Sequence, residues 1–170
     1  MDPANQRTID GLRLAIQDEA KGYHFYMMAA GSTKDSQGKG VFTRLAMEEL
    51  GHLQFLRTQY SALLQTGKPD EKARLGRRPR TAAPATIFSP EIYARLKEAH
   101  YEMSALSIGM RLEAAAVKLY TEMARQATDE TVRKFFDELV AWETGHYDAL
   151  SHQHEALQAR YWAAGGFTPY

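Results

Sequence analysis

Apolar side chains recur at steps of three and four residues along most of the chain, which is the spacing of one face of an α-helix. Between the stripes, glycines break the pattern in residues 31–40, and three prolines and two glycines break it in residues 67–88. Ser89 and Thr128 stand where two of the helices would begin, as N-caps. The pattern predicts an all-α chain whose apolar stripes cover about residues 9–30, 41–64, 92–127 and 132–155.

Two short-looped helix pairs joined by a long crossover are the connectivity of a ferritin-like four-helix bundle. A chain of 170 residues suits one domain. We therefore expect a single ferritin-like domain over residues 1–170, with the bundle at about 5–155. Residues 156–170 include two adjacent glycines, and we expect them to form a tail rather than a helix. The spacing leaves open whether residues 90–127 form one helix or two.

The amino-acid composition limits the partners and the metal ligands that the chain could have. The chain has 21 basic and 21 acidic residues, so no overall charge favours nucleic acid or an anionic membrane. It has no cysteine, which excludes disulfides, thiolate zinc sites and cysteine-bound iron centres. A bound metal would therefore need carboxylate, imidazole and water ligands, which suit iron and manganese, with zinc also possible. The first residues lack the pattern of a signal peptide, and we expect a cytoplasmic protein with no membrane segment.

The strongest feature of the sequence is an internal repeat. Residues 12–56 align without a gap with residues 106–150, a shift of 94 positions, and 12 of the 45 pairs are identical. Each half contains a glutamate, a tyrosine seven residues later, and Glu-x-x-His starting thirty residues after the first glutamate. The residues concerned are Glu19, Tyr26, Glu49 and His52 in the first half and Glu113, Tyr120, Glu143 and His146 in the second.

Helix geometry explains the spacing of the repeat. Residues three apart lie on one face, so the Glu and His of each Glu-x-x-His can bind the same ion. Interior glutamates would be costly if left ionised and unpaired, and divalent cations would compensate their charge. We therefore expect two metal ions within four carboxylates and two imidazoles. The two tyrosines lie on the glutamate face of their helices, either as packing residues or as hydrogen-bond donors to the carboxylates.

With these motifs the chain resembles the rubrerythrin-like branch of the ferritin-like di-iron proteins. "DEAKGYHFY" and "LEAAAVKLY" resemble the first and third helices of that family, and "EELGH" and "WETGH" resemble its second and fourth. The resemblance implies two iron ions per chain, which manganese or zinc could replace. It makes Glu19, Glu49, His52, Glu113, Glu143 and His146 the metal ligands, and hence the catalytic residues through the metals.

The resemblance also implies an oxidoreductase that reduces hydrogen peroxide or oxygen. Iron storage with ferroxidase activity, and oxygenation of an organic substrate, remain alternatives. Rubrerythrins carry a cysteine-rich rubredoxin domain, and this chain has no cysteine, so we expect electrons from a separate donor protein, rubredoxin-like or other. The family's extra glutamate in the third helix is replaced by Ala116, which predicts a symmetric six-ligand site.

Two further expectations concern assembly and partners. The poor helix-forming pattern of the tail argues against the fifth helix of a ferritin shell and favours a homodimer. The basic residues of "KARLGRRPR" (72–80) are either a solvated linker or a surface for an acidic electron donor. The linker interpretation is the simpler one.

Overall fold

The computed structural model describes residues 3–76 and 87–165, and all its regular structure there is helical. No helix in these two ranges is long and apolar enough to cross a membrane. The elements in chain order are α1 (Pro3–Ser32), α2 (Ser36–Thr66), the 3₁₀-helical segment η1 (Pro90–Glu98), α3 (His100–Gln126) and α4 (Glu130–Gly165).

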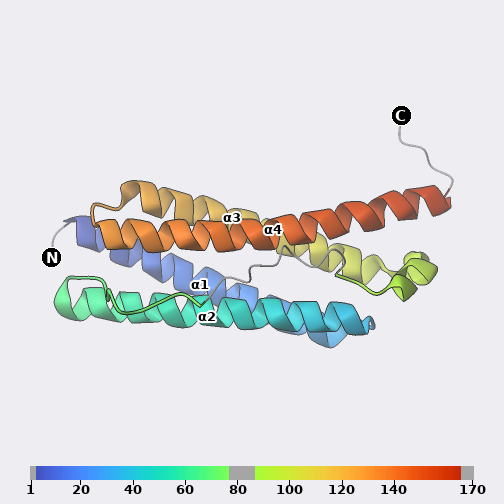
Figure 1. Cartoon of the computed structure of the whole chain (residues 1–170), viewed down its shortest axis with the longest axis horizontal. Helices are drawn as coiled ribbons and strands as arrows, with labels where there is room; N and C mark the ends of the chain where they lie inside the picture. The colour runs from blue at the N-terminus through green and yellow to red at the C-terminus, as the bar shows by residue number, and fades with distance from the viewer. Residues whose placement is uncertain (1–2, 77–86, 166–170) are drawn as a thin grey trace.

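The four long helices form two pairs. Helix α1 packs along α2 and α3 packs along α4, and the contact between α1 and α3 joins the pairs (Figure 1). Partners that are adjacent in sequence are thus also adjacent in space, as short connections require. The predicted all-α four-helix bundle is confirmed.

The connection between α1 and α2 is shorter than the glycines of residues 31–40 predicted. Only Thr33–Asp35 lie between the helices, and the Asp35 carboxylate accepts a hydrogen bond from the Gly38 backbone N–H at 2.7 Å. Gly38 lies inside α2, where an added Cβ would approach the Phe88 ring to 2.5 Å. This glycine therefore permits close packing and does not break the helix, so the predicted break is present but is confined to Thr33–Asp35.

Helix α4 begins with a different cap from the one predicted. Asp129, not Thr128, accepts hydrogen bonds from the backbone N–H groups of Thr131, at 2.8 Å, and Val132, at 3.1 Å. Asp129 corresponds to Asp35 in the repeat. The same carboxylate cap therefore starts the second helix of each pair.

Residues 90–127 form two elements, which settles the question that the sequence left open. Arg95 interrupts the helical conformation of η1 with φ −118° and ψ 29°, and α3 starts only at His100. The Ile92 N–H bonds to the Ser89 carbonyl at 3.2 Å, so the segment does begin after Ser89 as predicted.

The C-terminal segment corrects another expectation. Helix α4 continues through Gly165, so residues 156–165 are helical, and residues 166–170 lie outside the described part. Leu157 is fully buried one heptad after Leu150, and the Arg160 guanidinium stacks 3.9 Å from the centroid of the Tyr93 ring. The apolar stripe of α4 thus continues against η1 and supports two further turns. The homodimer stays a prediction.

The crossover is described at its two ends. The Gln59 side chain accepts from the Asp70 N–H at 2.9 Å and donates to the Asp70 carbonyl at 3.0 Å. At the far end, the Ile87 N–H donates to the Gln153 side-chain oxygen at 2.5 Å. Buried amides on α2 and α4 therefore hold both ends. Arg77, Arg78 and Arg80 of the predicted basic surface lie outside the described residues.

Two apolar clusters fill the bundle. One contains Tyr26, Phe42, Leu106 and Leu150 and receives Ile87, Phe88 and Ile92 from the end of the crossover and from η1. The other contains Leu12, Leu56, Tyr120, Phe136 and Leu139. Between the clusters every long helix contributes a buried glutamate, and that polar layer is where the candidate site lies.

Candidate metal centre

Each long helix carries one glutamate at the centre of two heptad steps. The residue seven positions before each of these glutamates and the residue seven positions after it are both buried, one in each apolar cluster. They lie on the same face as the glutamate because a seven-residue step returns to nearly the same side of a helix. The four series are Leu12–Glu19–Tyr26, Phe42–Glu49–Leu56, Leu106–Glu113–Tyr120 and Phe136–Glu143–Leu150. The glutamates are therefore held at one level of the bundle by the same packing that forms the core.

The structure brings together all six residues predicted from the repeat. They form two overlapping groups, and within each group the potential ligand atoms lie within 4.8 Å of one another. Glu49 and Glu143 belong to both groups. Every one of the six side chains is buried. The two groups are Glu19, Glu49, His52 and Glu143, and Glu49, Glu113, Glu143 and His146.

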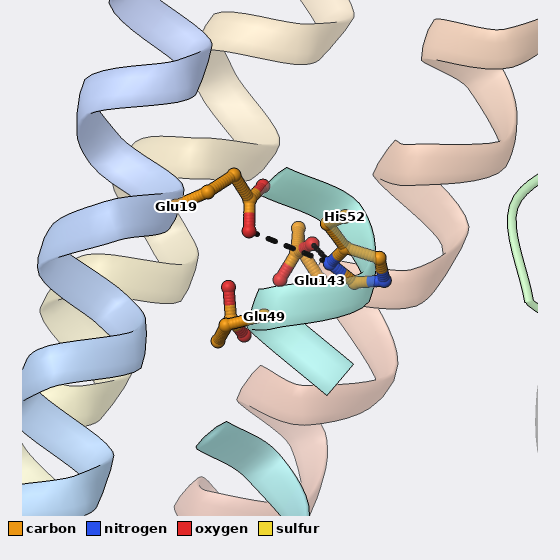
Figure 2. A group of neighbouring side chains, drawn as sticks. All are labelled: Glu19, Glu49, His52 and Glu143. Carbon is orange, nitrogen blue, oxygen red and sulfur yellow. Dashed lines mark ion pairs between the residues drawn. The ribbon is translucent and has the colours of Figure 1, made fainter. Parts of the chain in front are cut away.

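Figure 2 shows the first group, in which the carboxylates converge on one imidazole. The Nδ1 atom of His52 lies 3.0 Å from a Glu143 oxygen and 3.5 Å from a Glu19 oxygen. Glu49 points into the same space from α2 (Figure 2). Three helices thus supply the four side chains of this group.

The second group repeats this arrangement around His146. Its Nδ1 atom lies 3.1 Å from Glu143, 3.2 Å from Glu49 and 3.7 Å from Glu113. In both groups the Nδ1 atom faces the carboxylates. The two imidazoles stack with their centroids 5.9 Å apart.

The two tyrosines form hydrogen bonds across the bundle. The Tyr26 hydroxyl of α1 donates to Glu113 of α3, and the Tyr120 hydroxyl of α3 donates to Glu19 of α1. Both rings are also fully buried within the apolar clusters. Packing and hydrogen bonding were offered as alternatives for these residues, and the structure shows both.

Two neighbours of the site were missed. A Glu48 carboxylate oxygen lies 2.9 Å from Nε2 of His146, and the Trp142 ring meets His52 edge-on with centroids 5.0 Å apart. Glu48 comes from α2, 98 positions before its partner. The sequence did offer a way to find them. Glu48 and Trp142 each directly precede a site glutamate, and the 94-residue repeat aligns the two positions.

Burial shifts the proton equilibria of the site in the metal-free protein. Burial raises the pKa of Glu113 to about 8, although the nearby His146 imidazole opposes this. Burial alone would lower the pKa of His52, but the nearby carboxylates of Glu143 and Glu19 raise it to about 9. Burial and the neighbouring charge of Glu143 also raise the pKa of Glu49. Without metal, protons are held at these groups.

The donor set fits a divalent metal ion. Five buried atoms of the site have no aligned hydrogen-bond partner among the described residues: Glu19 Oε2, Glu49 Oε1, Glu143 Oε1 and both ring nitrogens of His52. Uncompensated buried polar atoms are unfavourable, and metal coordination would satisfy them. Oxygen and imidazole ligands with no sulfur suit iron or manganese. That these residues bind metal stays a prediction.

The position of the family's extra glutamate and the histidines outside the repeat can also be placed. Ala116 is half-buried, and its counterpart Gly22 is buried on α1, where an added Cβ would lie 3.2 Å from a Glu49 oxygen. His24, His100 and His152 are exposed and His154 is half-buried, and none of the four belongs to either ligand group.

A four-helix bundle with a buried, twofold-repeated glutamate and histidine cluster is the architecture of a ferritin-like protein, and the cluster suits a carboxylate metal site. A family model of rubrerythrin matches residues 10–153, which covers most of the bundle. The chain belongs to the rubrerythrin family. Searches of curated proteins and of solved structures found no match.

Proposed function

We propose that the chain holds two iron ions and reduces hydrogen peroxide or oxygen with electrons from a separate donor. The observation that carries this proposal is the pair of four-residue groups that share Glu49 and Glu143. Two groups that share two carboxylates are the arrangement needed for two neighbouring ions. Membership of the rubrerythrin family supports iron as the metal.

In this proposal each residue has a distinct place. Glu49 and Glu143 would be shared by the two ions, Glu19 and His52 would complete one half-site, and Glu113 and His146 would complete the other. When bound, iron supplies the redox change between ferrous and ferric states that two-electron reduction of peroxide to water needs. Electrons and protons must then be delivered from outside the bundle.

The chain contributes a rigid and dry setting. The tyrosine hydroxyls hold one oxygen each of Glu113 and Glu19, which leaves the second oxygen of each carboxylate to face the site. The apolar clusters on both sides exclude bulk water. Ala116 offers no carboxylate that could replace a histidine, so both histidines would stay bound in the oxidised and the reduced protein.

The source of electrons lies outside these 170 residues, because a cysteine-bound iron centre needs thiolates and the chain has none. The donor we propose is a small acidic redox protein of the rubredoxin kind, met by the basic segment that includes Arg77, Arg78 and Arg80. Changing these three arginines to serine should slow reduction by such a donor and flatten its salt dependence. Reduction by dithionite should not change.

The test of the proposed function begins with the metal. Protein loaded anaerobically with ferrous iron should retain about two ions per chain after desalting, as the two ligand groups require. The reduced protein is then mixed separately with hydrogen peroxide and with oxygen, and oxidation is followed by the absorbance of the ferric product. Rapid oxidation that repeats on each addition of reductant supports the reductase. Accumulation of ferric iron beyond two ions per chain would favour storage instead, and binding of no iron would refute the proposal.

A further inference from the structure

The two half-sites differ at the position just before each shared glutamate. Glu48 stands before Glu49 on α2, and Trp142 stands before Glu143 on α4, at positions that the repeat pairs. Each side chain reaches across to the histidine of the opposite helix. The Trp142 indole lies edge-on to both imidazoles, with centroids 5.0 Å from His52 and 6.0 Å from His146, so the Glu48 carboxylate beside His146 is what distinguishes the two histidines.

The histidine nitrogens show what this difference does. His146 directs Nδ1 at the site carboxylates and Nε2 at Glu48, 2.9 Å away. His52 also directs Nδ1 at the site, but its Nε2 is buried without a hydrogen-bond partner in the described part of the chain. The Glu48 side chain is only 18% exposed, so water screens this contact weakly.

A neutral imidazole that binds an ion through Nδ1 carries its proton on Nε2. A carboxylate that accepts this N–H fixes the tautomer and the ring orientation and makes the ligand nitrogen more basic. Loss of such a partner typically lowers metal affinity by about 10- to 100-fold. His146 has this support and His52 lacks it.

We propose that Glu48 is a positioning residue for His146, and that it makes the half-site of His146 bind its ion more tightly than the half-site of His52. This inference rests on the proposed two-ion site. It assigns an order of filling: the ion beside His146 enters first and leaves last. A preparation limited in metal would then hold a single ion beside His146.

The experiment uses Co²⁺, whose visible absorption reports ligand geometry, in calorimetric and optical titrations of the full chain. Wild type should bind two ions in two unequal steps. Glu48→Gln keeps the volume but removes the charge, and it should weaken the tighter step by about tenfold. Glu48→Ala should weaken that step further. Glu138→Gln is the matched control, because it removes the same charge from an exposed position of α4.

A double-mutant cycle locates the effect. In the His52→Ala background, which leaves the half-site of His146, Glu48→Gln should lower the remaining affinity about tenfold and shift the Co²⁺ spectrum. In the His146→Ala background it should change neither. If either background fails to fold, the two stepwise affinities of wild type and Glu48→Gln decide the same question.

The outcomes separate the two proposals. Two Co²⁺ ions bound with both affinities unchanged by Glu48→Gln, or with both lowered equally, would overturn the role of Glu48 and leave the two-ion site standing. Absence of Co²⁺ binding in wild type would overturn the proposed function and this inference together.

Discussion

The helix pair α1–α2 and the helix pair α3–α4 are two copies of one pattern, and they differ in an instructive way. Both copies keep the two site glutamates, the tyrosine, the histidine and the aspartate that caps the second helix. They differ beside the site, where Glu48 is replaced by Trp142 and Gly22 by Ala116. The side chains that face the centre are therefore identical in the two helix pairs, whereas the side chains that contact them from outside the centre differ.

The difference indicates two kinds of constraint on the repeat. A residue that faces the centre has a counterpart on the opposite helix pair, so a change on one side would unbalance charge in a buried layer. The residues beside the centre have no identical counterpart: Glu48 contacts His146, whereas Trp142 lies edge-on to both His52 and His146. Four predictions test this division between a symmetric centre and asymmetric surroundings.

The largest effect is expected from the shared glutamates. Glu49→Gln and Glu143→Gln each remove a carboxylate that belongs to both ligand groups, so each should reduce retained iron from about two ions per chain to nearly none. Glu19→Gln affects one group and should leave about one ion. Elemental analysis after desalting measures this. Equal losses for all three variants would contradict the assignment of Glu49 and Glu143 as bridges.

The next largest effect concerns pH. The folded pKa is about 9 for His52, against an ordinary 6.5, and about 8 for Glu113, against 4.5. Between about pH 4.5 and pH 9 the metal-free folded protein therefore binds more protons than the unfolded chain, and its stability falls as pH rises. Metal binding needs the deprotonated ligands, so affinity rises over the same range. The increase in Tm on adding Mn²⁺ should be larger at about pH 9 than at about pH 6; a smaller increase would contradict the protonated site.

A moderate effect is expected from the two tyrosines. Tyr26→Phe and Tyr120→Phe each remove a hydrogen bond to a buried carboxylate, which should cost about 1–3 kcal/mol of unfolding free energy. Because both tyrosines face the centre, the two costs should be equal within error. Urea denaturation of the metal-free protein measures them. A clear inequality would show that the asymmetry reaches the centre.

The smallest effect is expected from Ala116 and Gly22. Ala116→Glu introduces the carboxylate that rubrerythrin-like sites carry, and it should raise peroxide turnover by less than about tenfold. Gly22→Glu is the counterpart, but its Cβ would lie 3.2 Å from a Glu49 oxygen, so it should lower Tm and metal retention. Stopped-flow assays and thermal melts compare the two. Equal behaviour would mean that these positions are equivalent after all.

The sequence was enough to predict that the residues of the centre come together, because the helix period alone places them at one level. Glu19, Glu49, Glu113 and Glu143 stand one heptad from buried residues on both sides, so a local pattern was enough to bring them to one level. The repeat then identified the histidines. The sequence could not predict which atoms form contacts. An example is the hydrogen bond from each tyrosine hydroxyl to a carboxylate of the opposite helix pair.

The misplaced boundaries have a common cause, which is contact between distant parts of the chain. Gly38 interrupts the local pattern, but its reason is the Phe88 ring that packs on it from the end of the crossover. Residues 156–165 extend α4 because Leu157 and Arg160 find partners that include η1. Glu48 escaped notice because its partner His146 lies on another helix. None of these contacts between distant residues affects the three- and four-residue spacing of apolar positions, so the sequence pattern could not predict them.

The polar layer between the two apolar clusters also affects the order of folding. Helices α1 and α2, and likewise α3 and α4, are neighbours in sequence and can pair early at low entropic cost. Association of the two pairs then encloses four carboxylates, which cannot be buried as bare charges. The docking step must therefore take up protons or cations as it proceeds. Its rate should fall in alkaline, metal-free solution, where neither is supplied, and divalent metal should restore it, so the ions that we assign to catalysis would also assist assembly.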